Sequence, residues 1–216
     1  MTPPRVKIYC ISSIEEAKLA IKYGASAIGL VGNMPSEPGV IDDQLISEIV
    51  KTVPPAVSTF LLTSETTAKG IIVHYRKVNT TTIQIVDDLP KSEYAFLRAE
   101  LPNVKLVQVI HVSDENSVKE AVEASKYVDA ILLDSGNPNL RVKELGGTGR
   151  THNWDLSRQI RESIGIPLFL AGGINPNNVK EALEKVQPFG VDLCSGVRTD
   201  RKLDEEKLKA FFKEIG

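Results

Sequence analysis

Short apolar segments and longer segments of helical periodicity alternate along the whole chain, and this alternation is the feature that most constrains the fold. Several of the short segments, such as residues 130–133 and 167–170, are apolar without interruption. Uninterrupted apolar strands are typical of a parallel sheet that is covered on both faces. Chains that alternate strands with helices form either a closed barrel or an open doubly wound sheet.

Eight strand–helix pairs are expected in the 216 residues. We expect strands at residues 5–10, 27–31, 57–62, 82–85, 105–110, 130–134, 167–171 and 190–194. We expect their helices at residues 13–23, 42–52, 65–75, 91–101, 115–124, 155–164, 178–186 and 204–215. Because the eight units are regular and no Gly-x-Gly-x-x-Gly motif follows the first strand, the sequence favours, within the α/β class, the closed barrel over the open doubly wound sheet. We predict one (β/α)₈ TIM-barrel domain over residues 1–216.

The charge balance and the cysteines restrict the class of partner and the compartment. The 26 Lys and Arg residues against 28 Asp and Glu residues give a net charge of −2, which excludes a general attraction for nucleic acid or anionic membranes. No apolar run approaches the roughly 20 residues of a membrane span, and the start lacks the apolar region of a signal peptide. Cys10 and Cys194 are expected to be free thiols. We therefore predict a cytoplasmic protein that binds a small molecule, with homo-oligomerisation left open.

Two glycine-containing loops follow the last two expected strands. In a (β/α)₈ barrel, the loops at the C-terminal ends of the strands build the site, and the last two commonly bind phosphate. Glycine lets backbone N–H groups approach an anion without a Cβ in the way. The alternative is a pair of tight turns, but two such loops on a barrel pattern favour a phosphate site. The candidate phosphate-binding residues here are Gly172, Gly173, Asn175, Ser195, Gly196 and Arg198.

The loop after the sixth expected strand is unusually long and rich in glycine and hydrogen-bond donors. Its segment 146–154 predicts a lid over an anionic ligand, with Gly147, Gly149 and Arg150 as candidate contacts; the alternative is a flexible connector. Asp134 ends the strand before this loop, where burial could raise its pKa for proton transfer. The alternative for Asp134 is a helix cap or a loop carboxylate.

The first expected strand ends in Tyr9 and Cys10. Cys10 could act as a thiolate base or fill space as a buried apolar residue. Tyr9 could be a core aromatic residue or a hydroxyl donor in the mouth of the barrel.

Five segments, in this order, resemble the phosphoribosylanthranilate isomerase family. They are residues 6–11, 131–134, 146–154, 170–179 and 191–197, so the resemblance spans nearly the whole chain. It implies a (β/α)₈ barrel of tryptophan biosynthesis that works without metal or organic cofactor. It also implies an Amadori rearrangement, which converts the aminoaldose N-(5′-phosphoribosyl)anthranilate to an aminoketose by general acid/base catalysis.

The resemblance implies roles for some of the candidate residues. Asp134 matches the general acid that opens the ribose ring, while the loop residues Gly172, Gly173, Ser195 and Gly196 match the phosphate site. The base of the family is a cysteine at the end of the first strand, in the sequence Lys-Ile-Cys-Gly. Residues 7–10 here are Lys-Ile-Tyr-Cys.

This shift puts Tyr9 at the base position of the family and Cys10 at its glycine position. A shift of one residue in a strand sends a side chain to the opposite face. Cys10 can therefore serve as the base only if a bulge or looser geometry at the strand end restores its aim. Tyr9 is a poor substitute, because an ordinary tyrosine has a pKa of about 10.

The aromatic end of the substrate site also differs from the family. Gly39 stands where the family has an arginine that grips the anthranilate carboxylate, and residues 84–87 are Gln-Ile-Val-Asp in place of Gln-Leu-His-Gly. Three functions remain open. The first is an isomerase of this family, with Asp134 as acid and Cys10 as a displaced base. The second is a divergent barrel enzyme for another sugar phosphate, and the third is a non-catalytic barrel that senses a phosphorylated metabolite. We favour the first.

Overall fold

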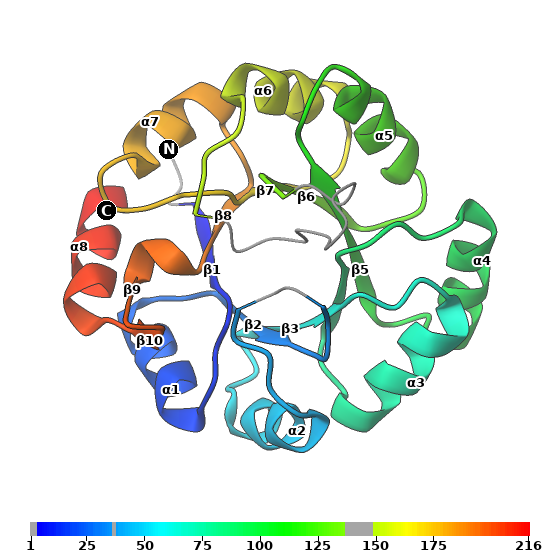
Figure 1. Ribbon diagram of the computed structural model, residues 1–216, viewed down its shortest axis with the longest axis horizontal. Helices are drawn as coiled ribbons and strands as arrows, with labels where there is room; N and C mark the ends of the chain where they lie inside the picture. The colour runs from blue at the N-terminus through cyan, green and yellow to red at the C-terminus, as the bar shows by residue number, and fades with distance from the viewer. Residues whose placement is uncertain (1–3, 36–37, 137–148) are drawn as a thin grey trace.

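The computed structural model describes residues 4–35, 38–136 and 149–216. Its eight main strands form a closed barrel in sequence order, and every neighbouring pair is parallel. The last strand pairs with the first, so the sheet has no free edge. Figure 1 looks down the barrel and shows the helices as an outer ring around the strands. The predicted (β/α)₈ fold is confirmed.

The elements lie close to the expected ranges. The barrel strands are β1 (Arg5–Ile8), β2 (Ala27–Val31), β3 (Ser58–Thr63), β4 (Thr82–Ile85), β5 (Lys105–His111), β6 (Ala130–Asp134), β7 (Leu168–Leu170) and β8 (Gly190–Leu193). The helices are α1 (Ile14–Tyr23), α2 (Asp43–Thr52), α3 (Ala68–Val78), α4 (Lys91–Glu100), α5 (Asn116–Ala124), α6 (Trp154–Ser163), α7 (Val179–Val186) and α8 (Glu205–Ile215).

Three stretches differ most from the expectation. The first strand was expected to reach residue 10, but β1 ends at Ile8, so Tyr9 and Cys10 follow it. The third helix was expected at residues 65–75, but α3 begins three residues later because the Thr67 side chain caps it by accepting from the Gly70 N–H. The eighth strand was expected to reach residue 194, but the chain leaves β8 there for a 3₁₀ turn, η1 (Ser195–Val197). A short hairpin of β9 (Arg198–Thr199) and β10 (Lys202–Leu203) then precedes α8, and the sequence did not predict it.

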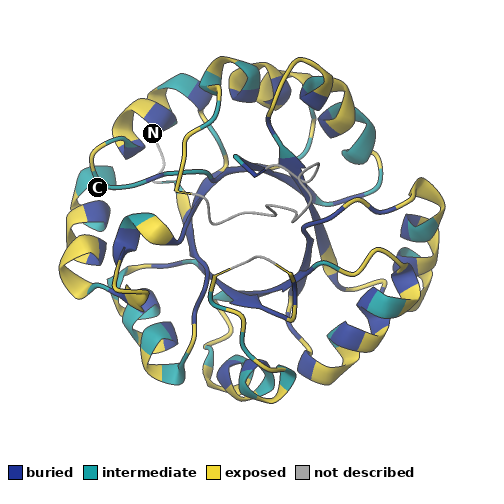
Figure 2. Cartoon of the chain, in the orientation of Figure 1, coloured by how far each residue is buried: buried dark blue, intermediate teal, exposed yellow. Residues whose placement is uncertain are grey.

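The apolar core has two layers, one between strands and helices and one inside the barrel. Figure 2 shows the strands as a buried ring, while the helices expose their outer faces. The interior layer includes Phe60, Val107, Leu132 and Phe169, which fill the barrel as packed side chains rather than leave a pore. No helix in the described ranges is long and apolar enough to cross a membrane.

A charged pair lies inside the barrel, near the C-terminal ends of the strands. Lys7 on β1 is fully buried, and its ammonium donates to the Asp192 carboxylate on β8 at 2.7 Å. The Lys7 Nζ atom also lies 5.1 Å from the ring centroids of Tyr9 and Phe60. A buried ammonium needs such partners because it has lost its hydration. We call the Lys7–Asp192 pair the floor of the barrel mouth, because it lies beneath the ends of the strands.

Candidate active site

Asp134 is the last residue of β6, and its carboxyl group is buried at the mouth of the barrel. Burial raises its pKa to about 6; the nearby Asp192 carboxylate acts in the same direction, whereas the Ser135 N–H and the Lys7 ammonium oppose the shift. The Ser135 N–H donates to Asp134 Oδ1 at 2.7 Å and so orients the carboxyl group. A carboxyl group with a pKa in this range can hold a proton near neutral pH and deliver it as a general acid.

Lys7 and Asp192 are site residues that the sequence analysis missed. Burial raises the pKa of Asp192, and the Lys7 ammonium lowers it. Asp192 Oδ1 is buried and has no hydrogen-bond partner among the described residues. A signal for both was present, because each is a charged residue between two apolar residues of a strand.

The loops after β6, β7 and β8 meet at the mouth of the barrel. Gly172 and Gly173 both have positive φ angles, of 78° and 65°. A Cβ on Gly173 would lie 2.7 Å from the carbonyl carbon of Arg150, and a Cβ on Gly196 would lie 2.1 Å from the carbonyl oxygen of Ile174. The three loops therefore touch at their backbones, which only glycine permits.

The packed glycine loops can hold an anion. Within the described ranges, the backbone N–H groups of Gly172 and Gly173 form no hydrogen bond. The Gly149 backbone, from the loop after β6, lies beside the Ser195 hydroxyl. Unpaired amides next to a hydroxyl are the donors that a phosphate dianion requires.

Of the four other predicted contacts, three lie within the described residues. The Asn175 side chain donates to the Gly173 carbonyl at 3.0 Å, so it shapes the loop from within. The Arg198 guanidinium donates to both carboxylate oxygens of Glu16, a residue of α1, at 2.9 Å. Arg150 is exposed. Gly147 lies outside the described residues. The roles of these four residues in phosphate binding stay predictions.

Tyr9 and Cys10 have different surroundings at the end of β1. Tyr9 lines a small cavity in the mouth of the barrel together with Asp134, Gly149, Gly172, Gly173, Ile174, Asp192, Leu193, Cys194 and Ser195. Cys10 has a φ angle of 60°, the left-handed conformation that glycine adopts most readily. Its thiol donates to the Pro38 carbonyl at 3.1 Å. The Cys194 thiol, which the sequence analysis did not place in the site, lies with its Sγ atom 2.7 Å from Cys10 Sγ.

The segment around Gly39 packs directly on Cys10. A Cβ on Gly39 would lie 2.6 Å from the Cβ of Cys10. The backbone after β2 therefore lies so close to the end of β1 that a side chain at position 39 would collide with Cys10. An arginine at position 39 would not fit while Cys10 stands opposite. The two departures from the family pattern are thus neighbours in space.

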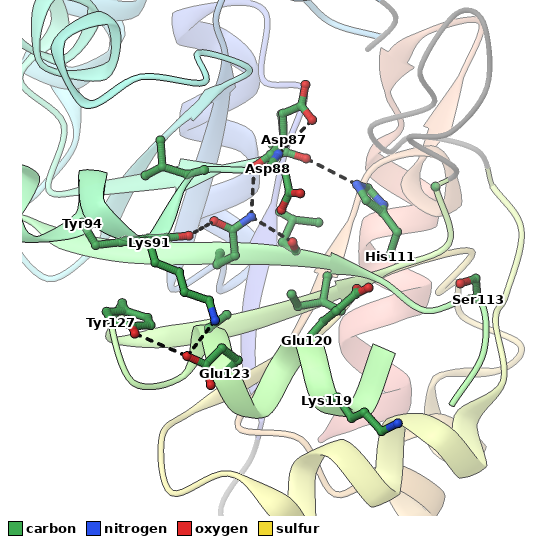
Figure 3. A pocket seen from close by; sticks show the side chains of 17 residues that line it. Asp87, Asp88, Lys91, Tyr94, His111, Ser113, Lys119, Glu120, Glu123 and Tyr127 are labelled. Carbon is green, nitrogen blue, oxygen red and sulfur yellow. Dashed lines mark hydrogen bonds and ion pairs between the residues drawn. The ribbon is translucent and has the colours of Figure 1, made fainter. Parts of the chain in front are cut away.

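A larger cavity of about 650 Å³ lies between α4 and α5, on the β4–β5 side of the molecule. Figure 3 shows that Asp87, Asp88, Glu120 and Glu123 gather around it, with Lys91 paired to Glu123. This acidic lining would repel a phosphate dianion. We therefore place the candidate site at the barrel mouth, where Asp134 and the glycine loops lie, despite the greater volume of this cavity.

His111, the last residue of β5, lies on the wall of the larger cavity and is opposite Asp134 in the strand register. Burial lowers its pKa, so the imidazole is neutral at neutral pH. Its Nδ1 atom is buried without a hydrogen-bond partner among the described residues. The sequence analysis did not single out His111, although a histidine at the end of a barrel strand is a signal for a site residue.

The chain is similar in sequence to proteins of one family. Residues 6–214 match the family model described as N-(5′phosphoribosyl)anthranilate (PRA) isomerase. An N-(5′-phosphoribosyl)anthranilate isomerase of Methanosarcina acetivorans is 36% identical, over 98% of this chain and 92% of the relative. One of Methanocella arvoryzae is 32% identical, over 98% of this chain and 97% of the relative.

Solved structures show the same similarity in three dimensions. A crystal structure of phosphoribosyl anthranilate isomerase from Thermotoga maritima matches with a TM-score of 0.84 and 29% identity, over 98% of both chains. A second crystal structure holds phosphoribosyl anthranilate isomerase in complex with reduced 1-(o-carboxyphenylamino)-1-deoxyribulose 5-phosphate. It matches with a TM-score of 0.82 and 26% identity, also over 98% of both chains.

Proposed function

The chain belongs to the N-(5′-phosphoribosyl)anthranilate isomerase family, and from this premise we propose that its barrel mouth carries out the Amadori rearrangement with Asp134 as the general acid. The observation that supports this assignment best is the buried Asp134 carboxyl, whose pKa is raised to about 6 and which shares a cavity with the glycine loops. The comparisons favour this isomerase activity over the two alternative functions.

Substrate binding is proposed to begin at the phosphate. The amides of Gly172 and Gly173, the Gly196 backbone and the Ser195 hydroxyl would hold the dianion at the C-terminal end of the barrel. The ribose ring would then lie over Asp134 and the Lys7–Asp192 floor. A substrate held by its phosphate has its reacting carbons fixed beside the acid and the base. The encounter of these groups then becomes an effectively unimolecular step.

The proposed reaction consists of proton transfers and one ring-opening cleavage of a C–O bond, which an acid and a base can catalyse without a metal or an organic cofactor. Asp134 protonates the ring oxygen, the bond from this oxygen to C1 breaks, and a protonated imine forms between C1 and the anthranilate nitrogen. The Ser135 N–H and the Lys7 ammonium then stabilise the Asp134 carboxylate that remains. A base removes the proton on C2, and the resulting enolamine becomes the ketone when C1 takes up a proton.

The base is proposed to be a thiolate at the barrel mouth. The resemblance implies Cys10, and Tyr9 occupies the position of the family's base. Cys10 Sγ lies 2.7 Å from Cys194 Sγ, and Cys10 has a φ angle of 60°, which is not a strand conformation. One of these two thiols therefore supplies the base.

We also propose the compartment, the binding partner and the oligomeric state of the enzyme. Both cysteines are free thiols, which fits the reducing cytoplasm. The partner is a small sugar phosphate. A homo-oligomer, which the sequence leaves open, is tested by light scattering of the purified protein; the Thermotoga maritima relative is described as dimeric.

The test of the function is turnover of phosphoribosylanthranilate by the purified chain, with Asp134→Asn as the matched control. We expect the wild-type protein to form the aminoketose product and the variant to lose about 10²–10⁴-fold in kcat, the usual contribution of a positioned general acid. Expression in a tryptophan auxotroph that lacks the isomerase should restore growth. An inactive wild-type protein that binds the substrate would contradict catalysis and favour a sensing role.

A further inference from the structure

Two thiols from neighbouring strands meet at the mouth of the barrel. Cys10 follows β1 and Cys194 follows β8, and both side chains are buried. Their Sγ atoms lie 2.7 Å apart, within hydrogen-bond distance for sulfur. The closure of the barrel brings them together, because 184 residues separate them in the chain.

Only one of the two cysteines lines the cavity that contains Asp134. Cys194 continues the inward-facing alternation of β8, two residues after Asp192, and it shares this cavity with Asp134, Tyr9 and Ser195. Cys10 is absent from the residues that line it, among those described. The Cys10 thiol is directed toward the Pro38 carbonyl, on the segment after β2.

The surroundings of Cys194 favour a thiolate. The hydrogen bond with Cys10 lowers the pKa of Cys194; burial opposes this shift, the positive charge of Arg198 adds to it, and the Asp192 carboxylate also opposes it. Once Cys194 is deprotonated, the S–H of Cys10 can turn from the Pro38 carbonyl to donate to the thiolate. The thiolate, not the thiol, accepts protons, so this arrangement prepares Cys194 for the role of a base.

We propose that Cys194 is the catalytic residue that removes the proton from C2 of the substrate, and that Cys10 is a positioning residue that holds its thiolate. This inference rests on the proposed function, since it assigns one step of that reaction. Cys194 lies in the same cavity as the acid, next to the Ser195 of the phosphate loop, so an open-chain sugar bound there faces both groups.

The step balances without any further reactant. The Cys194 thiolate takes the C2 proton and becomes a thiol. The electron pair of the broken C–H bond forms the C1–C2 double bond, and the π pair of the protonated imine moves onto the nitrogen. The neutral enolamine then loses its enol O–H proton while C1 gains one, which yields the ketone. The thiol returns its proton to solvent, and no net oxidation or reduction occurs.

The experiment compares Cys194→Ser with Cys10→Ser in the full chain, on substrate with hydrogen or deuterium at ribose C2. We expect Cys194→Ser to lower kcat by about 10²-fold or more with KM little changed, because a base acts on the transition state. Its deuterium isotope effect should exceed that of the wild type, because proton removal becomes slower than the other steps. Cys10→Ser should lower kcat by less than about 10-fold, since the serine hydroxyl can still donate to the thiolate.

Thermal unfolding of each variant shows whether it is folded, and Cys194→Ala repeats the test with a side chain that cannot ionise. A Cys194→Ser enzyme within about threefold of the wild-type kcat overturns the proposal. An equal or larger loss in Cys10→Ser overturns it as well, because Cys10 would then be the base. A wild-type protein that does not turn over phosphoribosylanthranilate contradicts the proposed function instead, so the two failures are distinguishable.

Discussion

At the scale of single residues, the ionisation of Asp134 follows from its surroundings. An aspartate in water is charged at neutral pH, but burial raises the pKa of Asp134 to about 6 from its ordinary value of 3.8. The folded state therefore binds this proton more tightly than the unfolded state does. The stability associated with the protonated carboxyl is fully present below about pH 3.8 and is lost as the pH rises through about 6.

Asp134→Asn should therefore stabilise the protein at pH 8 while it lowers kcat by about 10²–10⁴-fold. Asparagine keeps the oxygen that accepts from the Ser135 N–H but carries no charge. The shift from 3.8 to about 6 corresponds to at most about 3 kcal/mol, since one pKa unit is worth about 1.4 kcal/mol. Urea unfolding at pH 8 and pH 4 measures this. The gain should shrink toward pH 4; an equal gain at both pH values would contradict burial as the cause.

At the scale of elements, the loop after β7 depends on a residue without a side chain. Gly173→Ala would put a Cβ 2.7 Å from the Arg150 carbonyl carbon, at a φ angle of 65° that alanine rarely adopts. The loops must then separate, at a cost of about 1–3 kcal/mol. We expect KM for the phosphorylated substrate to rise by about 10-fold or more, with a smaller change in kcat.

Gly165→Ala is the matched control, because its Cβ would meet no atom within 4 Å. Its KM should equal that of the wild type. If Gly173→Ala also leaves KM unchanged, the glycine loops are not the phosphate-binding site.

The end of β1 and the segment after β2 interlock through Cys10 and Gly39. We expect Gly39→Ala to destabilise the protein by about 2 kcal/mol, because its Cβ would lie 2.6 Å from that of Cys10. Cys10→Gly removes the opposing Cβ. The double variant should therefore be more stable than the sum of the two single effects predicts, which a double-mutant cycle in urea measures. Simple additivity would show that the two residues are not in contact.

At the scale of the whole molecule, buried ion pairs join the first and last βα units. Lys7 pairs with Asp192, and Glu16 on α1 pairs with Arg198 after β8. Arg198 also donates to the Cys10 carbonyl, so it ties the ends of β1 and β8 together at the mouth. These side-chain contacts reinforce the β1–β8 pairing, which closes the barrel.

Arg198→Ala should destabilise the protein by about 3 kcal/mol, because it leaves the largely buried Glu16 carboxylate without its cation. The matched control is Lys22→Ala, whose partner Glu205 also joins the two ends of the chain but at an exposed site. That control should show no measurable change, since exposed pairs are screened by water and salt. Urea unfolding of both variants measures the difference, and equal effects would contradict the role of burial.

The sequence by itself determined the barrel, the candidate acid and the glycine loops. These depend on local signals: the period of apolar residues, the residue that ends a strand, and the glycines that follow it. Asp134 lies at the end of β6, at the mouth, where its position after an apolar run predicted it. Element boundaries moved by up to three residues, as at α3, where the capping side chain chose the start.

Only the tertiary structure decided which side chains meet. The Lys7–Asp192 pair, the contact between Cys10 and Cys194, and the engagement of Arg198 with Glu16 each join residues more than 180 positions apart. Closure of the barrel makes them neighbours, and no local pattern encodes that distance. The direction of the Cys10 side chain follows from its backbone conformation just after β1, where the φ angle is 60°. Gly39 packs against Cys10 at the same place. For this reason the sequence suggested a thiol base at Cys10, whereas the folded barrel shows that Cys194 is the cysteine that lines the cavity of Asp134.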